Sequence, residues 1–115
     1  MKKRSVAFSL LLLCGCVDMG RVGMHPELKS FYLDGSPHEV AGCLYSAASH
    51  QHLFLERDDP LPGGTRRYKL KDTDNEDVAW VEISSAPHKQ SHVNVYQARE
   101  ADVRTAVSAM VARCQ

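Results

Sequence analysis

The sequence predicts an α+β domain in which one helix, a four-stranded antiparallel meander and a second helix follow one another. Apolar residues recur with a helical period at about 36–49 and again at about 98–114, whereas four short runs between residues 51 and 97 alternate with a period of two. Short, turn-rich segments separate these runs, which indicates antiparallel neighbours, because parallel strands need longer crossovers. We expect both helices to cover one face of the sheet.

The first helix has a distinct start signal. Ser36 can cap it, Pro37 suits its first position, and Glu39 lies three residues after the cap and completes a capping box. One apolar stripe at positions i, i+3, i+4 and i+7 follows, made by Val40, Cys43, Leu44 and Ala47. The helix is expected to end at about Ser49.

Four strands are expected, at residues 53–57, 67–71, 78–84 and 92–97. Alternation places one set of apolar side chains under the helices: Leu53, Leu55, Leu70, Ala79, Val81, Ile83, Val93 and Val95. The other face receives Phe54, Val78, Trp80 and Tyr96. In a two-layer domain that face meets solvent, and exposed aromatics there are typical of a surface that binds a partner. The alternative is that residues 31–33 or a long loop cover it.

The second helix is expected to begin at about Ala98. Its apolar stripe consists of Val103, Ala106, Val107, Met110 and Cys114. Cys43 and Cys114 therefore lie on the stripes of the two helices.

The first sixteen residues have a different character. Lys2, Lys3 and Arg4 precede an apolar run, Val6–Leu13, that is too short to span a bilayer. The run ends in Leu13-Cys14-Gly15-Cys16, which resembles the lipobox of bacterial lipoproteins except at Cys14, where Ala or Ser is usual. The resemblance implies that residues 1–15 are a signal peptide and that Cys16 carries the lipid.

The resemblance also implies a location. In that family an Asp directly after the lipidated cysteine favours retention in the inner membrane, and here Val17 stands there. We therefore expect a lipid anchor in the outer membrane, at its periplasmic face. Residues 16–35 are predicted to be a lipidated tether, of which residues 31–33 dock onto the domain, and residues 36–115 a small periplasmic domain.

Processing would leave Cys43 and Cys114 as the remaining pair of cysteines, in an oxidising compartment. A disulfide between them is therefore expected. It would join the two helices and close a loop of about 70 residues, a constraint of roughly 4 kcal/mol on the chain-entropy model.

Charge and motifs limit the function. Loss of the three N-terminal cations leaves 11 Lys and Arg against 14 Asp and Glu, so the mature chain is acidic and lacks a surface for nucleic acid. No nucleophile with a base and an orienting acid, and no Gly-rich phosphate loop, is visible, so neither an enzyme nor a cofactor is predicted.

The sequence thus indicates a lipid-anchored envelope protein with a small binding or structural domain. Phe54, Trp80 and Tyr96 are the candidate face for an envelope protein partner. One alternative is a periplasmic metal- or small-ligand-binding lipoprotein, whose weak candidate ligands are His50, His52, His88 and His92. Another is an inhibitor or small hydrolase acting at the cell wall.

Overall fold

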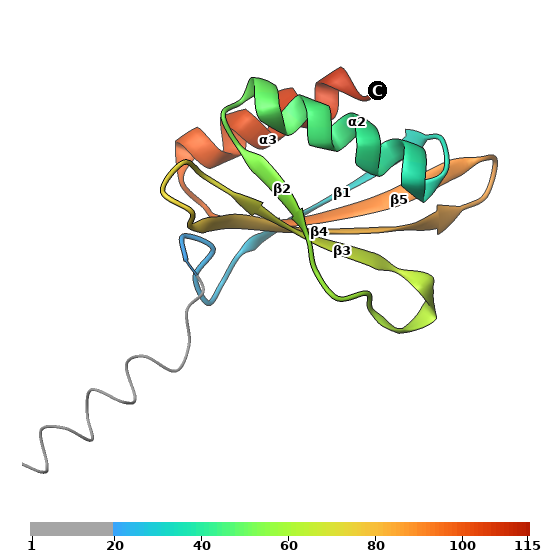
Figure 1. The fold of residues 1–115 in the computed structure, drawn as a ribbon, viewed down its shortest axis with the longest axis horizontal. Helices are drawn as coiled ribbons and strands as arrows, with labels where there is room; N and C mark the ends of the chain where they lie inside the picture. The colour runs from blue at the N-terminus through green and yellow to red at the C-terminus, as the bar shows by residue number, and fades with distance from the viewer. Residues whose placement is uncertain (1–19) are drawn as a thin grey trace, which may run out of the picture.

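Two helices lie on one face of a five-stranded antiparallel sheet (Figure 1). The structure, a computed structural model, describes residues 20–115, so the predicted signal peptide 1–15 and lipidation site Cys16 lie outside the described residues. The elements, in chain order, are β1 (Glu27–Asp34), α2 (Pro37–His50), β2 (Phe54–Arg57), a short 3₁₀ turn (Pro62–Gly64), β3 (Arg66–Lys71), β4 (Asp77–Ala86), β5 (Gln90–Gln97) and α3 (Ala101–Arg113). The α+β class is confirmed.

The predicted number of strands is wrong, because there is a fifth. Residues Glu27–Asp34, expected in the tether, form β1 and pair with β5 from Glu27 opposite Gln97 to Asp34 opposite Gln90. The strand order is β1-β5-β4-β3-β2, so the meander of β2 to β5 is extended by a strand from before the first helix. The sheet therefore joins the two ends of the domain.

Helix α2 begins as predicted. The Glu39 backbone N–H donates to Ser36 Oγ (3.2 Å), and the Ser36 N–H donates to Glu39 Oε1 (2.9 Å), which completes the capping box. Helix α3 begins at Ala101, later than the predicted Ala98, because Ala98 still donates a backbone hydrogen bond to the carbonyl of Val78 (2.9 Å).

A disulfide joins Cys43 of α2 to Cys114 at the end of α3, as predicted. The two Cα atoms are 5.9 Å apart and 71 positions apart in the sequence. The covalent loop therefore contains β2 to β5 and most of both helices, while β1 lies outside it.

The core lies between the sheet and the helices. All eight strand residues predicted to lie there are buried. Val78, which was expected on the other face, is also in the core, and this correction has a clear cause. The β3–β4 register shifts so that Leu70 faces Ala79 but Lys71 faces Asp77, which leaves Val78 as the extra residue of a bulge.

Candidate functional site

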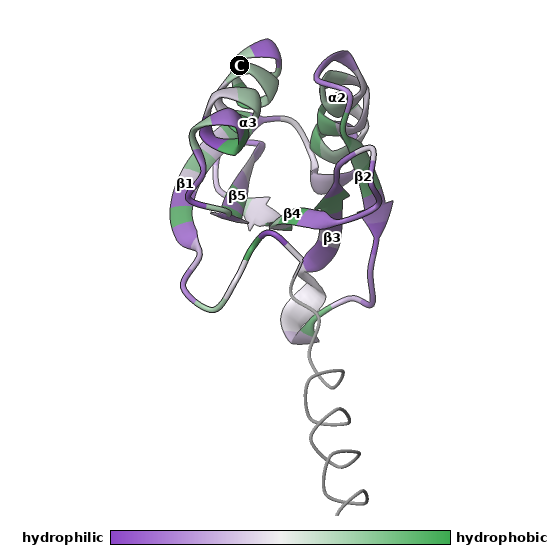
Figure 2. Cartoon of the chain, turned by 90° about the vertical axis from the view of Figure 1, so that its left-hand side faces the viewer, coloured by the Kyte–Doolittle hydropathy of each residue, from purple (hydrophilic) through white to green (hydrophobic). Residues whose placement is uncertain are grey.

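Figure 2 shows both helices on one side of the sheet. The opposite face carries the predicted aromatic residues, and we call it the open face. One row of cross-strand neighbours runs over it from edge to edge: Glu56, Lys69, Trp80, Tyr96 and Leu28. Direct cross-strand partners share one face, and the strand neighbours of Trp80, Ala79 and Val81, are buried on the other. Trp80 and Tyr96 are therefore turned away from the helices.

The structure brings two of the three predicted aromatics together. Trp80 and Tyr96 are direct partners across β4 and β5, and both are half-buried. Phe54 lies at the β2 edge, separated from them by β3, and is exposed. The Arg67 guanidinium lies over the Trp80 ring, 5.5 Å from its centroid, a cation–π contact.

Strand β1 widens the face beyond the prediction. Leu28 lies opposite Tyr96, and the Tyr32 ring stacks on His92 with 4.8 Å between centroids. Both Leu28 and Tyr32 are exposed. Sequence reasoning missed them because it assigned these positions to the tether.

One end of the open face is partly covered. The segment 20–26 passes beneath the sheet, on the side away from the helices (Figures 1 and 2). Within it Val22 is buried, although it does not belong to the core under the helices. The sequence offered residues 31–33 or a long loop as the cover, whereas the segment just before β1 supplies it.

Arg21 fixes this segment to the domain. Its backbone N–H donates to the carbonyl of Asp77 (2.7 Å), and its guanidinium contacts Asp102 (2.8 and 3.0 Å), Glu100 (2.7 Å) and Asp72 (3.3 Å). We call this arrangement the Arg21 clasp. It lowers the pKa of Asp102, chiefly through the Arg21 hydrogen bonds. The pKa of Asp72 is lowered mainly by the Glu76 backbone N–H and then by Arg21.

Gly20 packs tightly beside the clasp. A Cβ at this position would lie 2.7 Å from the Asp77 backbone nitrogen, and its φ is +57°. Both the space and the backbone conformation therefore favour glycine where the chain joins the domain.

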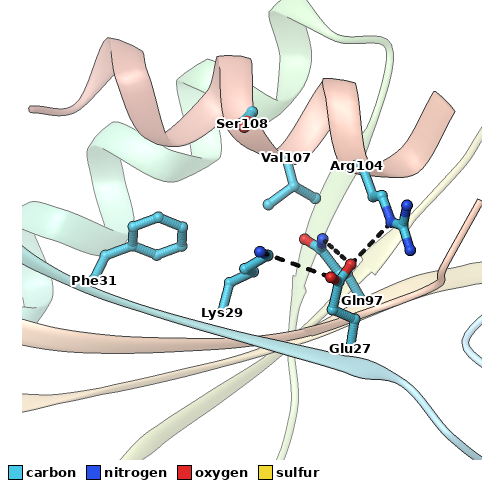
Figure 3. A pocket seen from close by; sticks show the side chains of 7 residues that line it. All are labelled: Glu27, Lys29, Phe31, Gln97, Arg104, Val107 and Ser108. Atoms are coloured by element: carbon cyan, nitrogen blue, oxygen red, sulfur yellow. Dashed lines mark hydrogen bonds and ion pairs between the residues drawn. The ribbon is translucent and has the colours of Figure 1, made fainter. Parts of the chain in front are cut away.

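A shallow pocket of about 380 Å³ lies between α3 and β1 (Figure 3). At one side Glu27 accepts hydrogen bonds from Gln97 Nε2 (3.1 Å) and Arg104 Nε (3.0 Å), and Lys29 Nζ lies 3.7 Å away. These contacts lower the pKa of Glu27, the Gln97 amide most of all. Gln97 Oε1 is buried without a hydrogen-bond partner. The charged groups of this pocket thus pair largely with one another.

The candidate metal ligands are not brought together. Within residues 20–115, no three His, Cys, Asp or Glu side chains form a group that could hold a metal ion. His50 lies 3.2 Å from an Arg113 nitrogen, His92 stacks on Tyr32, and His88 lies in the β4–β5 turn. The open face is therefore the stronger candidate site.

Comparison with protein-family models and with curated proteins found no match for this chain. In the part of the chain that the structure describes, no helix has both the length and the apolar character to cross a membrane.

Proposed function

We propose that this protein is a lipid-anchored component of the bacterial cell envelope whose small domain acts by contact and not by catalysis. The observation that carries the proposal is the open face, where the half-buried pair Trp80 and Tyr96 is flanked by exposed Leu28, Tyr32 and Phe54. Aromatic side chains gathered on one accessible face are typical of binding surfaces. The opposite face of the same sheet is buried beneath both helices.

Two features support the proposed location. The segment before Cys16 resembles a lipoprotein signal, and Val17 follows the cysteine, which fits an anchor at the periplasmic face of the outer membrane. A disulfide between the helices also fits an oxidising compartment, because cytosolic thiols are kept reduced.

Alanine substitutions on the two sides of the domain test the binding role. Tyr32→Ala and Phe54→Ala remove exposed rings from the open face, and Tyr45→Ala removes an equally exposed ring from α2 as a matched control. Binding of the anchored protein to purified envelope fractions should weaken for the first two variants. A loss of about 2 kcal/mol, thirtyfold in affinity, is expected if either ring is an anchor. Equal loss in all three variants would contradict the proposal.

A further inference from the structure

We infer that the open face lies against the membrane in which Cys16 is anchored, so that the partner of this surface is the lipid headgroup layer. The inference rests on the proposed lipid anchor. It replaces the unspecified envelope component of the proposed function with a surface of definite chemistry.

The chain between Cys16 and the domain is short, and we call residues 17–19 the linker. Sequence reasoning expected a tether of twenty residues, but the domain already begins at Gly20 and Arg21, which pack against Asp77. Only residues 17–19 separate Cys16 from Gly20. Four steps of extended chain reach at most about 14 Å. The surface of the domain to which the linker is attached must therefore lie close to the bilayer.

The linker joins the domain on the side of the open face. The described chain starts below the sheet, on the side opposite α2 and α3, in both views (Figures 1 and 2). The Arg21 clasp holds this start in place through contacts to β4, to the β3–β4 turn and to the beginning of α3. A short linker attached on that side holds the open face next to the lipid, with the helices on the far side of the domain.

Most of the large exposed apolar side chains gather on the same side of the domain. Five large ones are prominent within residues 20–115. Met24 lies in the segment 20–26 beneath one end of the open face, Leu28, Tyr32 and Phe54 lie on that face, and of the five only Tyr45 lies on a helix. Aromatic and aliphatic side chains of this kind are stabilised at the boundary between headgroups and acyl chains. The face that the linker holds next to the membrane thus also carries the aromatic and aliphatic side chains that are stable at the headgroup boundary.

Charge disfavours an orientation in which the end of the sheet at the Arg21 clasp, and not the open face, is turned to the lipid. Next to the Arg21 clasp the end of the sheet is acidic: Asp72, Glu100 and Asp102 contact Arg21, and the β3–β4 turn adds Asp74 and Glu76. Anionic lipid would repel that end. On the open face, β3 presents Arg67, Lys69 and Lys71. Arg67 pairs with Asp58 and lies opposite Glu82, and Lys71 pairs with Glu56 and Asp77, so acidic groups balance these cations. A nearly neutral aromatic face can approach headgroups without this repulsion.

A pair of single-tryptophan proteins tests the orientation. Trp80 is the sole tryptophan, so Trp80→Phe gives a silent background for Tyr32→Trp on the open face and Tyr45→Trp on α2. The two tyrosines are 61% and 63% exposed, which makes them a matched pair. The full lipidated chain is placed in vesicles of phosphatidylethanolamine and phosphatidylglycerol containing lipids with brominated acyl chains, which quench at short range.

We expect several-fold stronger quenching of Tyr32→Trp than of Tyr45→Trp. A Gly-Ser insertion of about twenty residues between Val17 and Asp18 should reduce this difference in quenching, because a long linker lowers the effective concentration of the open face at the lipid. Equal melting temperatures of the two variants confirm that both are folded.

Each other outcome has a definite meaning. Equal quenching of the two positions, or stronger quenching at Tyr45→Trp, in protein that floats with the vesicles overturns the orientation and leaves the anchor intact. Protein that does not float, with Cys16 unmodified, refutes the proposed anchor instead. In the same brominated vesicles reconstituted with extracted envelope proteins, shielding of Tyr32→Trp from both brominated lipid and aqueous acrylamide would show that an envelope protein occupies the face, and would overturn lipid as its partner.

Discussion

Replacing Arg21 by methionine should loosen the segment that precedes β1. Methionine retains much of the apolar stem but removes the guanidinium that contacts Asp102, Glu100 and Asp72. The backbone hydrogen bond to Asp77 can remain, so the variant isolates the ionic part of the Arg21 clasp.

The size of the effect follows from the exposure of the partners. Asp102 and Glu100 are more than half exposed, so solvent screens their ion pairs with Arg21. Asp72 is mostly buried but its contact is longer, at 3.3 Å. We expect a total loss of about 1–2 kcal/mol, which corresponds to a fall in Tm of roughly 5–10 °C for a domain of this size.

The pH dependence supplies the decisive test. The folded pKa values of Asp72 and Asp102 lie below those of the unfolded chain, so their stabilising contribution is complete above about pH 5 and is lost as the pH falls through the folded values. For Asp102 the main cause is Arg21, so this contribution disappears in Arg21→Met. For Asp72 the main cause is a backbone N–H, which the variant keeps. The gap in stability between the two proteins should therefore shrink below pH 4.

Urea unfolding at pH 7 and pH 3 measures this gap. The matched control is Arg57→Met, because Arg57 is exposed and forms no ion pair among residues 20–115, and it should change stability by less than about 0.5 kcal/mol. A gap that is the same at both pH values, or an equal effect of Arg57→Met, would refute the ionic explanation of the clasp.

Three further predictions concern the disulfide, the open face and the anchor. The double variant Cys43→Ala/Cys114→Ala should lose about 2–4 kcal/mol in denaturant unfolding, because a loop of 71 residues is released in the unfolded state, and a loss below about 0.5 kcal/mol would contradict this. Trp80→Ala should cost about 1–2 kcal/mol, less than the roughly 3–5 kcal/mol of a core tryptophan, and a larger fall together with acrylamide-resistant emission of the parent protein would place the ring in a core. Cys16→Ser should abolish acyl labelling and release the protein from membranes, whereas labelling that persists would move the lipid to another residue.

The elements with strong local signals could be predicted from the sequence. Helix α2 has a capping box and a continuous apolar stripe, both of which act within a few residues. Seven core positions in β2 to β5, and Leu53 just before β2, followed from alternation, since each of these strands is covered by the helices on one side only. The disulfide followed because both cysteines lie on the stripes that pack together.

The features that the sequence did not predict depend on distant contacts. In β1 the helix-facing positions begin with Glu27 and Lys29, which line the pocket at the rim of α3, so the apolar alternation is visible only at Phe31 and Leu33. The Arg21 clasp joins residues separated by 51 to 81 positions, and no local pattern marks it. Sequence alternation therefore placed Trp80 and Tyr96 on the side away from the helices but did not reveal that β1 extends this face.

The position of the disulfide also decides how the molecule responds to mechanical load. A pull on the N-terminal end acts first on the Arg21 clasp and then on the pairing of β1 with β5, and neither is covalent. The load reaches a covalent cross-link only at Cys43. Residues 21–42 can therefore unfold and extend to about 75 Å while residues 43–114 remain closed as one covalent loop. When the opposing force acts at the C-terminal end, the disulfide transmits it past β2 to β5, so β1 detaches while the other four strands bear no load.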